Sequence, residues 1–209
     1  MENPSNSIGL KYELKRKLIH ISSLVIPLSY YFLERNFLLI ILLVFSVLSV
    51  LIDIIRRSSP GFGKLYDKIF GDILREHETD KKNIFFTGGT YILISFFLCV
   101  LLFQKDIAIL SMMVIIVCDT AAAITGKTIG RRKIGSKTLE GSIAFFITAL
   151  ILYFLILKQQ GLNVIYAGLL TVFLTTLFEL IPLKADDNIT IPLFFGIVYS
   201  TLTNTKLLI

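Results

Sequence analysis

The sequence predicts an all-α integral membrane protein, built as a single domain over residues 1–209 with about seven transmembrane helices. Hydrophobic residues make up 55% of the 209 residues, charged residues only 17%, and the mean hydropathy is +0.77. A soluble globular domain averages roughly 45–50% apolar and about 25% charged residues. Apolar segments long enough to cross a bilayer, which takes roughly 17–25 residues, recur along the whole chain. Most connections between them are too short for a second domain.

Three predicted spans lie in the first half of the chain, at 18–33, 36–55 and 87–104. The polar residues 1–17 are not followed by a short apolar core with a small-residue cleavage site, so no signal peptide is expected. Pro27 interrupts the first of these spans. The connection 56–86 is the longest in the chain; it is polar, and "GFGKLYDKIFGDILREHE" within it indicates an amphipathic segment.

Four further spans are predicted in the second half, at 106–126, 139–157, 162–183 and 190–207. Pro182 interrupts the third of these. The two cysteines, Cys99 and Cys118, both fall inside spans, so we interpret them as small apolar residues and not as a disulfide.

The basic residues predict the orientation of the spans. With seven spans, 17 of the 21 lysines and arginines fall on one side, and the positive-inside rule places that side and the N-terminus in the cytoplasm. Of the 15 acids, 13 lie on or near the same side, all but Glu34 and Asp106. The rule does not predict this second bias, which suggests a site at the cytoplasmic membrane surface. The net charge of +6 is then mainly a topology signal and requires no nucleic-acid partner.

Several ionisable residues lie at or near the cytoplasmic ends of the predicted spans: His20, Asp53, Asp119, Glu140 and Glu179. A charged side chain at the centre of a transmembrane helix costs roughly 2.5–3.5 kcal/mol, and such residues usually mark sites. Structural explanations remain open for three of them. The helix dipole favours Glu140 in a first turn, Asp53 can pair with Arg56 or Arg57 one turn on, and His20 can be a core histidine.

Asp119 is harder to explain structurally. In a helix that runs to Gly126 it sits about 10 Å from the helix end at 1.5 Å per residue. Asp119, Ala122, Ala123 and Gly126 follow helical spacing, so the acid shares one face with small residues. Close helix packing explains the small residues but not the aspartate. We therefore predict a functional role for Asp119.

The loop after Asp119 is basic and rich in glycine. "GKT" at 126–128 resembles part of a phosphate-binding P-loop, but Ala121 stands where that motif needs a glycine, and a membrane helix precedes it in place of a strand. A weaker phosphate-binding hypothesis survives, in which glycines turn backbone N–H groups inward and lysines supply charge. The residues concerned are Gly126, Lys127, Gly130, Lys133, Gly135 and Lys137. The positive-inside rule alone also explains a basic loop here.

A second acidic group lies far along the chain. Glu179 comes just before the break at Pro182, and Asp186, Asp187 and Asn188 are expected in the short loop that follows. Carboxylate and amide oxygens are hard ligands that suit Mg²⁺. Alone this would be an ordinary acidic turn, but together with Asp119 it predicts a metal site.

Taken in order, these motifs resemble the CTP-dependent lipid-alcohol kinases: dolichol kinase, phytol kinase and CTP-dependent diacylglycerol kinase. The segment "CDTAAAITGKTIGRRKIGSKTLEGS" (118–142) is similar to the signature of that family. The resemblance extends to "ELKRKLIH" (13–20), to Asp53 with Arg56, to "FFTGGTY" (85–91) and to "DDNITIPL" (186–193). Cys118 stands where the family often has glycine.

The phosphatidate cytidylyltransferases resemble the chain more distantly. They share an Asp-Thr-x-Ala pattern followed by Gly-Lys/Arg and Lys-Thr-x-Glu-Gly, but they carry a longer acidic and glycine-rich motif towards the C-terminus. "DDNITIPL" stands in its place here, and this departure favours a kinase.

The resemblance and the residue chemistry lead to one hypothesis, a kinase that uses CTP and Mg²⁺ at the cytoplasmic membrane face. Phosphoryl transfer needs mainly positioning and charge stabilisation from the protein. The metal would be held by Asp119, Asp187 and Asn188. The nucleotide would be bound by Gly126, Lys127, Gly130, Lys133, Lys137 and Thr138.

The same hypothesis names the reacting and lipid-binding groups. The expected catalytic residues are Asp119, Lys137, Glu140 and Glu179, where either glutamate could orient the acceptor hydroxyl, act as base or bind a second metal. The lipid alcohol, a polyprenol, a phytol-like alcohol or diacylglycerol, would meet Arg16, His20, Asp53 and Arg56. The preference for CTP over ATP comes only from the resemblance.

Two alternatives remain open. A cytidylyltransferase would release pyrophosphate and make a CDP-lipid. A small transporter or scaffold would do no chemistry, although a transporter favours acids near mid-membrane and often inverted repeats. The expected location is the cell membrane in a prokaryote or an ER-like membrane in a eukaryote, and self-association is left open.

Overall fold

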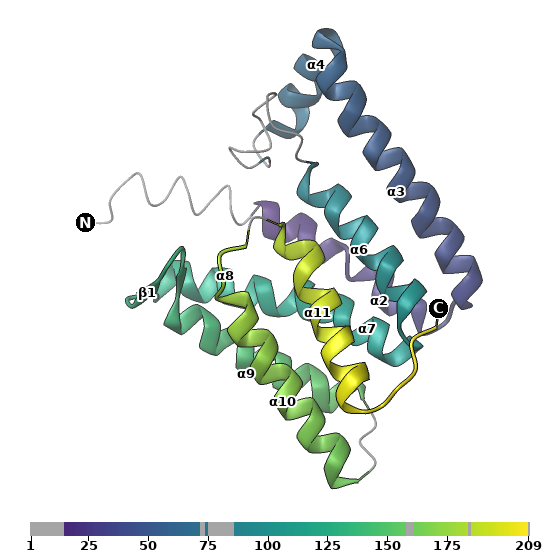
Figure 1. The fold of residues 1–209 in the computed structure, drawn as a ribbon. Helices are drawn as coiled ribbons and strands as arrows, with labels where there is room; N and C mark the ends of the chain where they lie inside the picture. Colours follow the sequence, from purple (N-terminus) through teal and green to yellow (C-terminus); the bar gives the residue numbers. More distant parts are fainter. Residues whose placement is uncertain (1–14, 72–73, 75–85, 158–160, 184, 209) are drawn as a thin grey trace.

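The computed structural model describes residues 15–71, 74, 86–157, 161–183 and 185–208, and these are almost entirely helical (Figure 1). A helical segment at 15–22 comes first. It is followed by α2 (Val25–Tyr30), α3 (Arg35–Ser58), α4 (Pro60–Phe70), α6 (Gly88–Leu102) and α7 (Lys105–Met113). A π-helical turn, η2 (Val114–Cys118), joins α7 to α8 (Asp119–Thr128). The remaining elements are β1 (Lys133–Ile134), β2 (Lys137–Thr138), α9 (Leu139–Ile156), α10 (Leu162–Glu179) and α11 (Asp187–Leu202).

Each of the seven predicted spans contains helix, but the described helices differ in length. Four are long and apolar enough to cross a membrane: Arg35–Ser58, Lys105–Thr128, Leu139–Ile156 and Leu162–Glu179. Gly88–Leu102 is apolar but shorter. The prediction of a helical membrane protein is thus supported, while seven crossings and a cytoplasmic N-terminus stay predictions.

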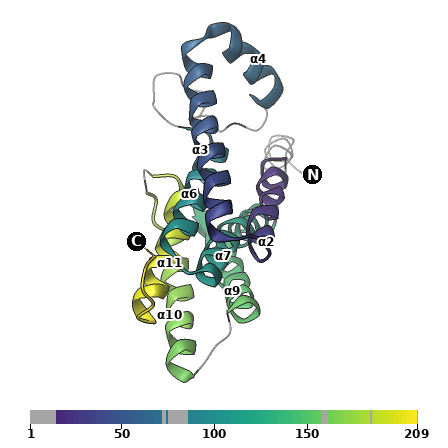
Figure 2. The same cartoon turned by 90° about the vertical axis from the view of Figure 1, so that its right-hand side faces the viewer.

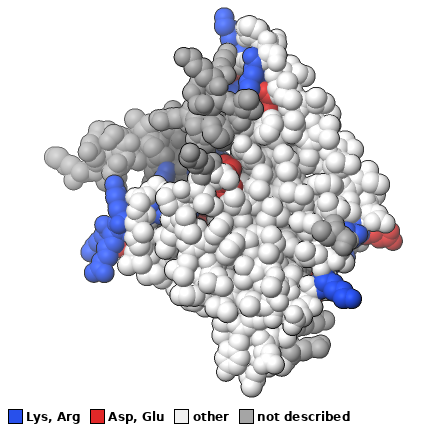
Figure 3. All heavy atoms as spheres, in the orientation of Figure 1, with Lys and Arg blue, Asp and Glu red and all other residues white. Residues whose placement is uncertain are grey.

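Helix α3 has the composition of a helix that faces lipid. Only 22% of its most apolar window is buried, and Phe37, Ile40 and Leu51 are each about half exposed. Figure 2 shows α3 as one long helix beside α6, with α4 folded over at its far end. Figure 3 shows charged side chains around α4 and the β1 end and again at the right-hand edge of the molecule, with a broad surface without charge between them. An apolar band between charged ends is expected where lipid is the solvent.

The continuous helix Lys105–Thr128 forms the core of the molecule. In its most apolar window 67% of residues are buried, three times the share in α3. Ile109, Met112 and Ile116 are fully enclosed, because α2, α6, α9 and α11 all pack around this helix. The π-helical turn η2 immediately precedes Asp119, and such turns often accompany functional sites.

Small residues bring α8 and α9 close together. A Cβ on Gly126 would come within 2.7 Å of Thr138 Oγ1, and one on Gly141 within 2.9 Å of the Ala122 carbonyl oxygen. Thr138 also caps α9, since its hydroxyl accepts a hydrogen bond from Gly141 N (3.2 Å). The small-residue face predicted around Asp119 therefore does form a tight helix contact.

The basic loop folds as a two-stranded antiparallel hairpin. Lys133 pairs with Thr138 and Ile134 with Lys137, so Gly135 and Ser136 form the turn. Gly135 has φ +61°, a conformation that suits glycine in two-residue hairpin loops. The hairpin fixes which lysines face α9 and the cavity described below.

Helix α11 begins earlier than the sequence suggested. Its first residue is Asp187, so Asp187 and Asn188 lie in its first turn and not in a loop. The physical reason is the N-cap: the carboxylate of Asp186 accepts a hydrogen bond from Asn188 N at 2.9 Å. This start places both residues against the end of α10.

Candidate active site

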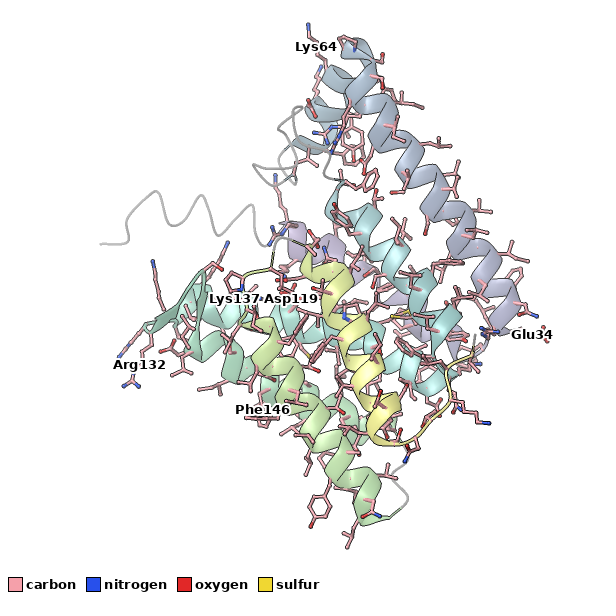
Figure 4. All side chains as sticks on the ribbon, viewed as in Figure 1. Glu34, Lys64, Asp119, Arg132, Lys137 and Phe146 are labelled. Atoms are coloured by element: carbon pink, nitrogen blue, oxygen red, sulfur yellow. The ribbon has the colours of Figure 1, made fainter. Side chains whose placement is uncertain are left out.

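A cavity of ≈ 300 Å³ lies where the helix at 15–22, α8, β2, α9, α10 and α11 meet. Figure 4 labels two of its side chains, Asp119 and Lys137, close together at this junction. The face of α8 that carries Asp119, Ala122, Ala123 and Gly126 forms one wall. The predicted site residues that line the cavity are Arg16, Asp119, Gly126, Lys127, Lys137, Thr138, Glu179 and Asp187.

Asp119 is bound on one side by Lys17, a residue for which the sequence predicted no role. The Lys17 ammonium donates to the Asp119 carboxylate and, at 3.4 Å, to its backbone oxygen. His20 Nδ1 lies 4.0 Å from the same carboxylate. Lys17 is only 4% exposed, so this is a buried ion pair between residues 102 positions apart. The available signal was the spacing of Lys17 and His20, which puts both on one helix face.

Lys137 links the other two carboxylates of the cavity. Its ammonium lies 2.8 Å from Glu179 Oε1 and 3.0 Å from Asp187 Oδ2, and it also donates to the Glu179 carbonyl oxygen. Ser142 Oγ donates to Glu179 Oε2 at 3.3 Å. Burial alone would lower the pKa of Lys137, but the carboxylates of Asp187 and Glu179 outweigh it and raise that pKa above its ordinary value. Lys137 therefore stays charged at neutral pH.

The charges around the cavity suit an anionic ligand. Four cations (Arg16, Lys17, Lys127, Lys137) and three carboxylates (Asp119, Glu179, Asp187) line it. Lys17 is paired with Asp119, and Lys137 bridges Glu179 and Asp187, so a ligand that brings its own negative charge can take over these contacts. Lysine ammonium groups bind phosphate as point charges.

The carboxylates of the cavity could hold a magnesium ion only together with phosphate oxygens of a bound substrate. Among the described residues no cluster of three or more His, Cys, Asp or Glu side chains is close enough to hold a metal. Mg²⁺, however, is commonly bound by one or two carboxylates, waters and substrate phosphates together. Asp119 and Asp187 suit that mode, whereas Asn188 faces a different cavity.

Three predicted site residues lie away from the first cavity. The Glu140 carboxylate accepts from Arg132 N (3.3 Å to each oxygen), so it holds the segment before the hairpin. Gly130 packs against Gly126 and Thr138, where a Cβ would come within 2.1 Å of the Gly126 carbonyl oxygen. Lys133 is exposed on β1.

Asp53 and Arg56 also lie outside it, and each has a partner other than the one considered from sequence. Asp53 is 2% exposed, and its Oδ2 accepts from Thr87 N (2.8 Å), Thr87 Oγ1 (3.1 Å) and Thr90 Oγ1 (2.7 Å). Arg56 bonds Asp67 through Nε (3.0 Å) and a terminal nitrogen (2.9 Å). Its guanidinium also lies 4.9 Å from the centre of the Tyr66 ring. These contacts tie α3 to α6 and α4.

A second cavity of ≈ 250 Å³ adjoins the first. It lies between the helix at 15–22, α4, α6 and the start of α11. Three predicted site residues line it, namely Arg16, His20 and Asn188, and Arg16 borders both cavities.

Comparison with known proteins finds relatives along most of the chain. An uncharacterized protein of Rickettsia prowazekii is 29% identical over 187 residues, covering 88% of this chain and 91% of its own. CTP-dependent diacylglycerol kinase 1 of Eremothecium gossypii is 30% identical over 218 residues, covering 92% of this chain and 68% of its own. The enzyme of the same name from Schizosaccharomyces pombe is 33% identical over 100 residues, 46% of this chain and 43% of its own. No family model matches the chain, and no solved structure matches it.

Proposed function

This chain belongs to the family of CTP-dependent lipid kinases, and we propose that it phosphorylates a membrane lipid alcohol with CTP as donor, assisted by Mg²⁺. Diacylglycerol is the first acceptor to test, because two of the relatives above carry it in their names. The observation that carries the proposal is the first cavity, where four cations and three carboxylates converge beside apolar helices.

The cavity offers the nucleotide lysines for its phosphate oxygens and carboxylates for the metal ion that accompanies it. In the ligand-free arrangement Lys17 is paired with Asp119, and Lys137 with Glu179 and Asp187. When a triphosphate enters, Lys17, Lys127 and Lys137 would turn to its oxygens, and the released carboxylates would be available to hold a metal ion and to orient the acceptor. Cations aimed at the transferring phosphoryl group stabilise the charge of the transition state.

The reaction is a single displacement at the γ-phosphorus. The lipid hydroxyl oxygen forms a bond to that phosphorus while the bond to the β,γ-bridging oxygen breaks, and CDP leaves with the electron pair. The hydroxyl proton passes to a carboxylate or to water. Glu179, held by Lys137 and Ser142 at the end of α10, is the carboxylate that we assign to orienting the hydroxyl.

Asp119 and Asp187 are the residues that would hold magnesium, together with phosphate oxygens. When bound, the ion neutralises phosphate charge. Glu140 drops from the catalytic set in this proposal, because its carboxylate supports the hairpin backbone and does not line the cavity.

The site faces the cytoplasm in this proposal, and the chain crosses the membrane seven times. The basic-residue bias supports that orientation, and cytoplasmic CTP requires it. Cysteines placed at 64 and 133 should resist labelling from outside intact cells, whereas one placed at 36 should react. Strong external labelling at 133 would contradict the orientation.

The deciding experiment is a product analysis. Purified protein is incubated with Mg²⁺, with CTP or ATP, and with diacylglycerol, phytol or a polyprenol, and both products are identified by mass. We expect CDP and a lipid monophosphate, with CTP preferred. Pyrophosphate and a CDP-lipid from phosphatidate would instead indicate a cytidylyltransferase, and no turnover of any lipid would contradict the proposal.

A further inference from the structure

The second cavity combines apolar walls with a polar end. Ile19, Phe70 and Ile92 contribute apolar surface, while Arg16, His20 and Asn188 contribute polar groups. Its volume of ≈ 250 Å³ is below the roughly 300–1,000 Å³ of pockets for drug-sized ligands. A cavity of this size suits the polar end of a lipid whose chains remain outside.

The two cavities are adjacent. Arg16 lines both of them. His20 lines the second, and its Nδ1 lies 4.0 Å from Asp119 Oδ2, which belongs to the first. The successive residues Asp187 and Asn188 line the first and the second cavity respectively. Group transfer needs donor and acceptor atoms within about 3–3.5 Å, which adjoining cavities allow and distant ones do not.

The outer wall of the second cavity is an amphipathic helix. Helix α4 exposes Leu65 (56%) and Ile69 (59%) on one side and carries Lys64 and Lys68 among them. It directly follows the apolar helix α3, at the charged end of the molecule (Figures 1 and 3). Helices of this composition lie in the membrane interface, with apolar residues among the acyl chains. Phe70 of the same helix lines the cavity and is 42% exposed, so the cavity wall continues onto a lipid-facing surface.

We propose that the second cavity is the acceptor subsite, which takes the hydroxyl and ester end of a glycerolipid alcohol. The hydroxyl passes Arg16 and His20 into the first cavity, where Glu179 lies, and the acyl chains leave along α4 into the bilayer. The inference rests on the kinase function proposed above. It assigns the cavity to the lipid and not to the cytosine ring, which Tyr66 and Phe70 could otherwise stack against.

Gly89 offers a direct test, because it lines the cavity and leaves open space where a side chain can be added. It is the second residue of α6, it lines the cavity, and a Cβ added to it meets no atom within 4 Å. Gly61 is a matched control: it is the second residue of α4, has the same open space, and does not line the cavity. Both substitutions replace glycine in a helix, so neither is expected to impair folding.

In mixed micelles, Gly89→Leu should raise the KM for diacylglycerol about tenfold or more, with the KM for CTP unchanged. Gly89→Ala should raise it less, and Gly61→Leu should leave both constants within about twofold. An unchanged lipid KM in an active Gly89→Leu enzyme overturns the assignment. A raised KM for CTP with an unchanged KM for the lipid overturns it too, because that result would place the cytosine ring of CTP in the second cavity.

A binding measurement separates this inference from the kinase proposal. A diacylglycerol with a diazirine beside the glycerol should label α4 or α6 in the wild-type protein, in competition with unlabelled diacylglycerol but not with CTP. Labelling should fall in Gly89→Leu and persist in Gly61→Leu. Equal labelling in both variants overturns the acceptor subsite, even if the enzyme phosphorylates lipids. Cavity labelling without turnover of any lipid contradicts the kinase proposal alone.

Discussion

Asp119 and Asp53 are both aspartates near the charged end of an apolar helix, yet their surroundings differ in kind. Asp53 is 2% exposed and receives three hydrogen bonds from Thr87 and Thr90, so its charge joins α3 to the start of α6. The Asp119 side chain is 20% exposed, faces a cavity, and is held by a lysine that a phosphate can draw away. Asp53 therefore has the surroundings of a structural residue, whereas Asp119 has the open space that a ligand would need.

The strongest test of this contrast is Asp119→Asn. We expect kcat to fall about 10²–10³-fold, because in the proposed mechanism this carboxylate would help to hold the metal, and its loss would weaken charge stabilisation worth several kcal/mol. The buried Lys17 then lacks its counter-charge, so the melting temperature should also fall.

The double variant Asp119→Asn with Lys17→Met separates these two effects. It should recover thermal stability in detergent without recovering turnover. Near-normal kcat in the single variant at saturating Mg²⁺ and CTP would make Asp119 a structural residue like Asp53. Asp106→Asn is the control, because it replaces an aspartate that does not line the cavity and should leave kcat nearly unchanged.

The hairpin provides a second comparison, between a lysine inside the cavity and one outside it. Lys137→Met should lower kcat/KM for CTP about 10–100-fold, since a charge-assisted contact to phosphate contributes about 1.5–3 kcal/mol. Lys133→Met, four residues earlier on the exposed strand, should change it less than twofold. Steady-state kinetics with varied CTP measures both. Equal losses would mean that the hairpin acts only through its overall charge.

Asp53→Asn should affect stability and leave chemistry almost intact. Asparagine still accepts one of the bonds from Thr87 or Thr90, so we expect the free energy of unfolding to fall by about 2 kcal/mol. The kcat of the folded fraction should stay within about threefold. Thr90→Val removes a single donor and should cost less. A hundredfold loss of kcat at unchanged stability would show that Asp53 belongs to the catalytic machinery after all.

The last comparison is between the two glutamates that sequence alone could not distinguish. Glu140→Gln should change kcat/KM less than threefold, because glutamine can still accept from Arg132 N. Glu179→Gln, inside the cavity, should reduce kcat at least tenfold through its bonds to Lys137 and Ser142. Steady-state rates measured in parallel on the two variants test this difference. A larger loss of rate in Glu140→Gln than in Glu179→Gln would show that Glu140 is the catalytic glutamate.

Local pattern was enough for the helices, for the small-residue face and for the three acids that line the first cavity. Apolar runs and helical spacing depend on neighbours in the chain, so α3, α9 and α10 were placed within a few residues. Asp119 could be singled out because a carboxylate in an apolar segment is costly wherever it lies. The start of α11 was missed by three residues, because the cap by Asp186 competes with the expectation of an acidic loop.

The amino-acid sequence by itself therefore determined a helical membrane protein with acids and bases gathered at one end, since hydropathy and charge act along the chain. The pairing of those charges was decided only by tertiary structure. Lys17 meets Asp119 across 102 positions, and Lys137 meets Asp187 across 50. Asp53 finds its partners 34 and 37 positions away, and not one turn along its own helix. Helix packing selects these partners, because a hydrogen bond forms only between polar groups that the packed helices hold within about 3 Å of each other.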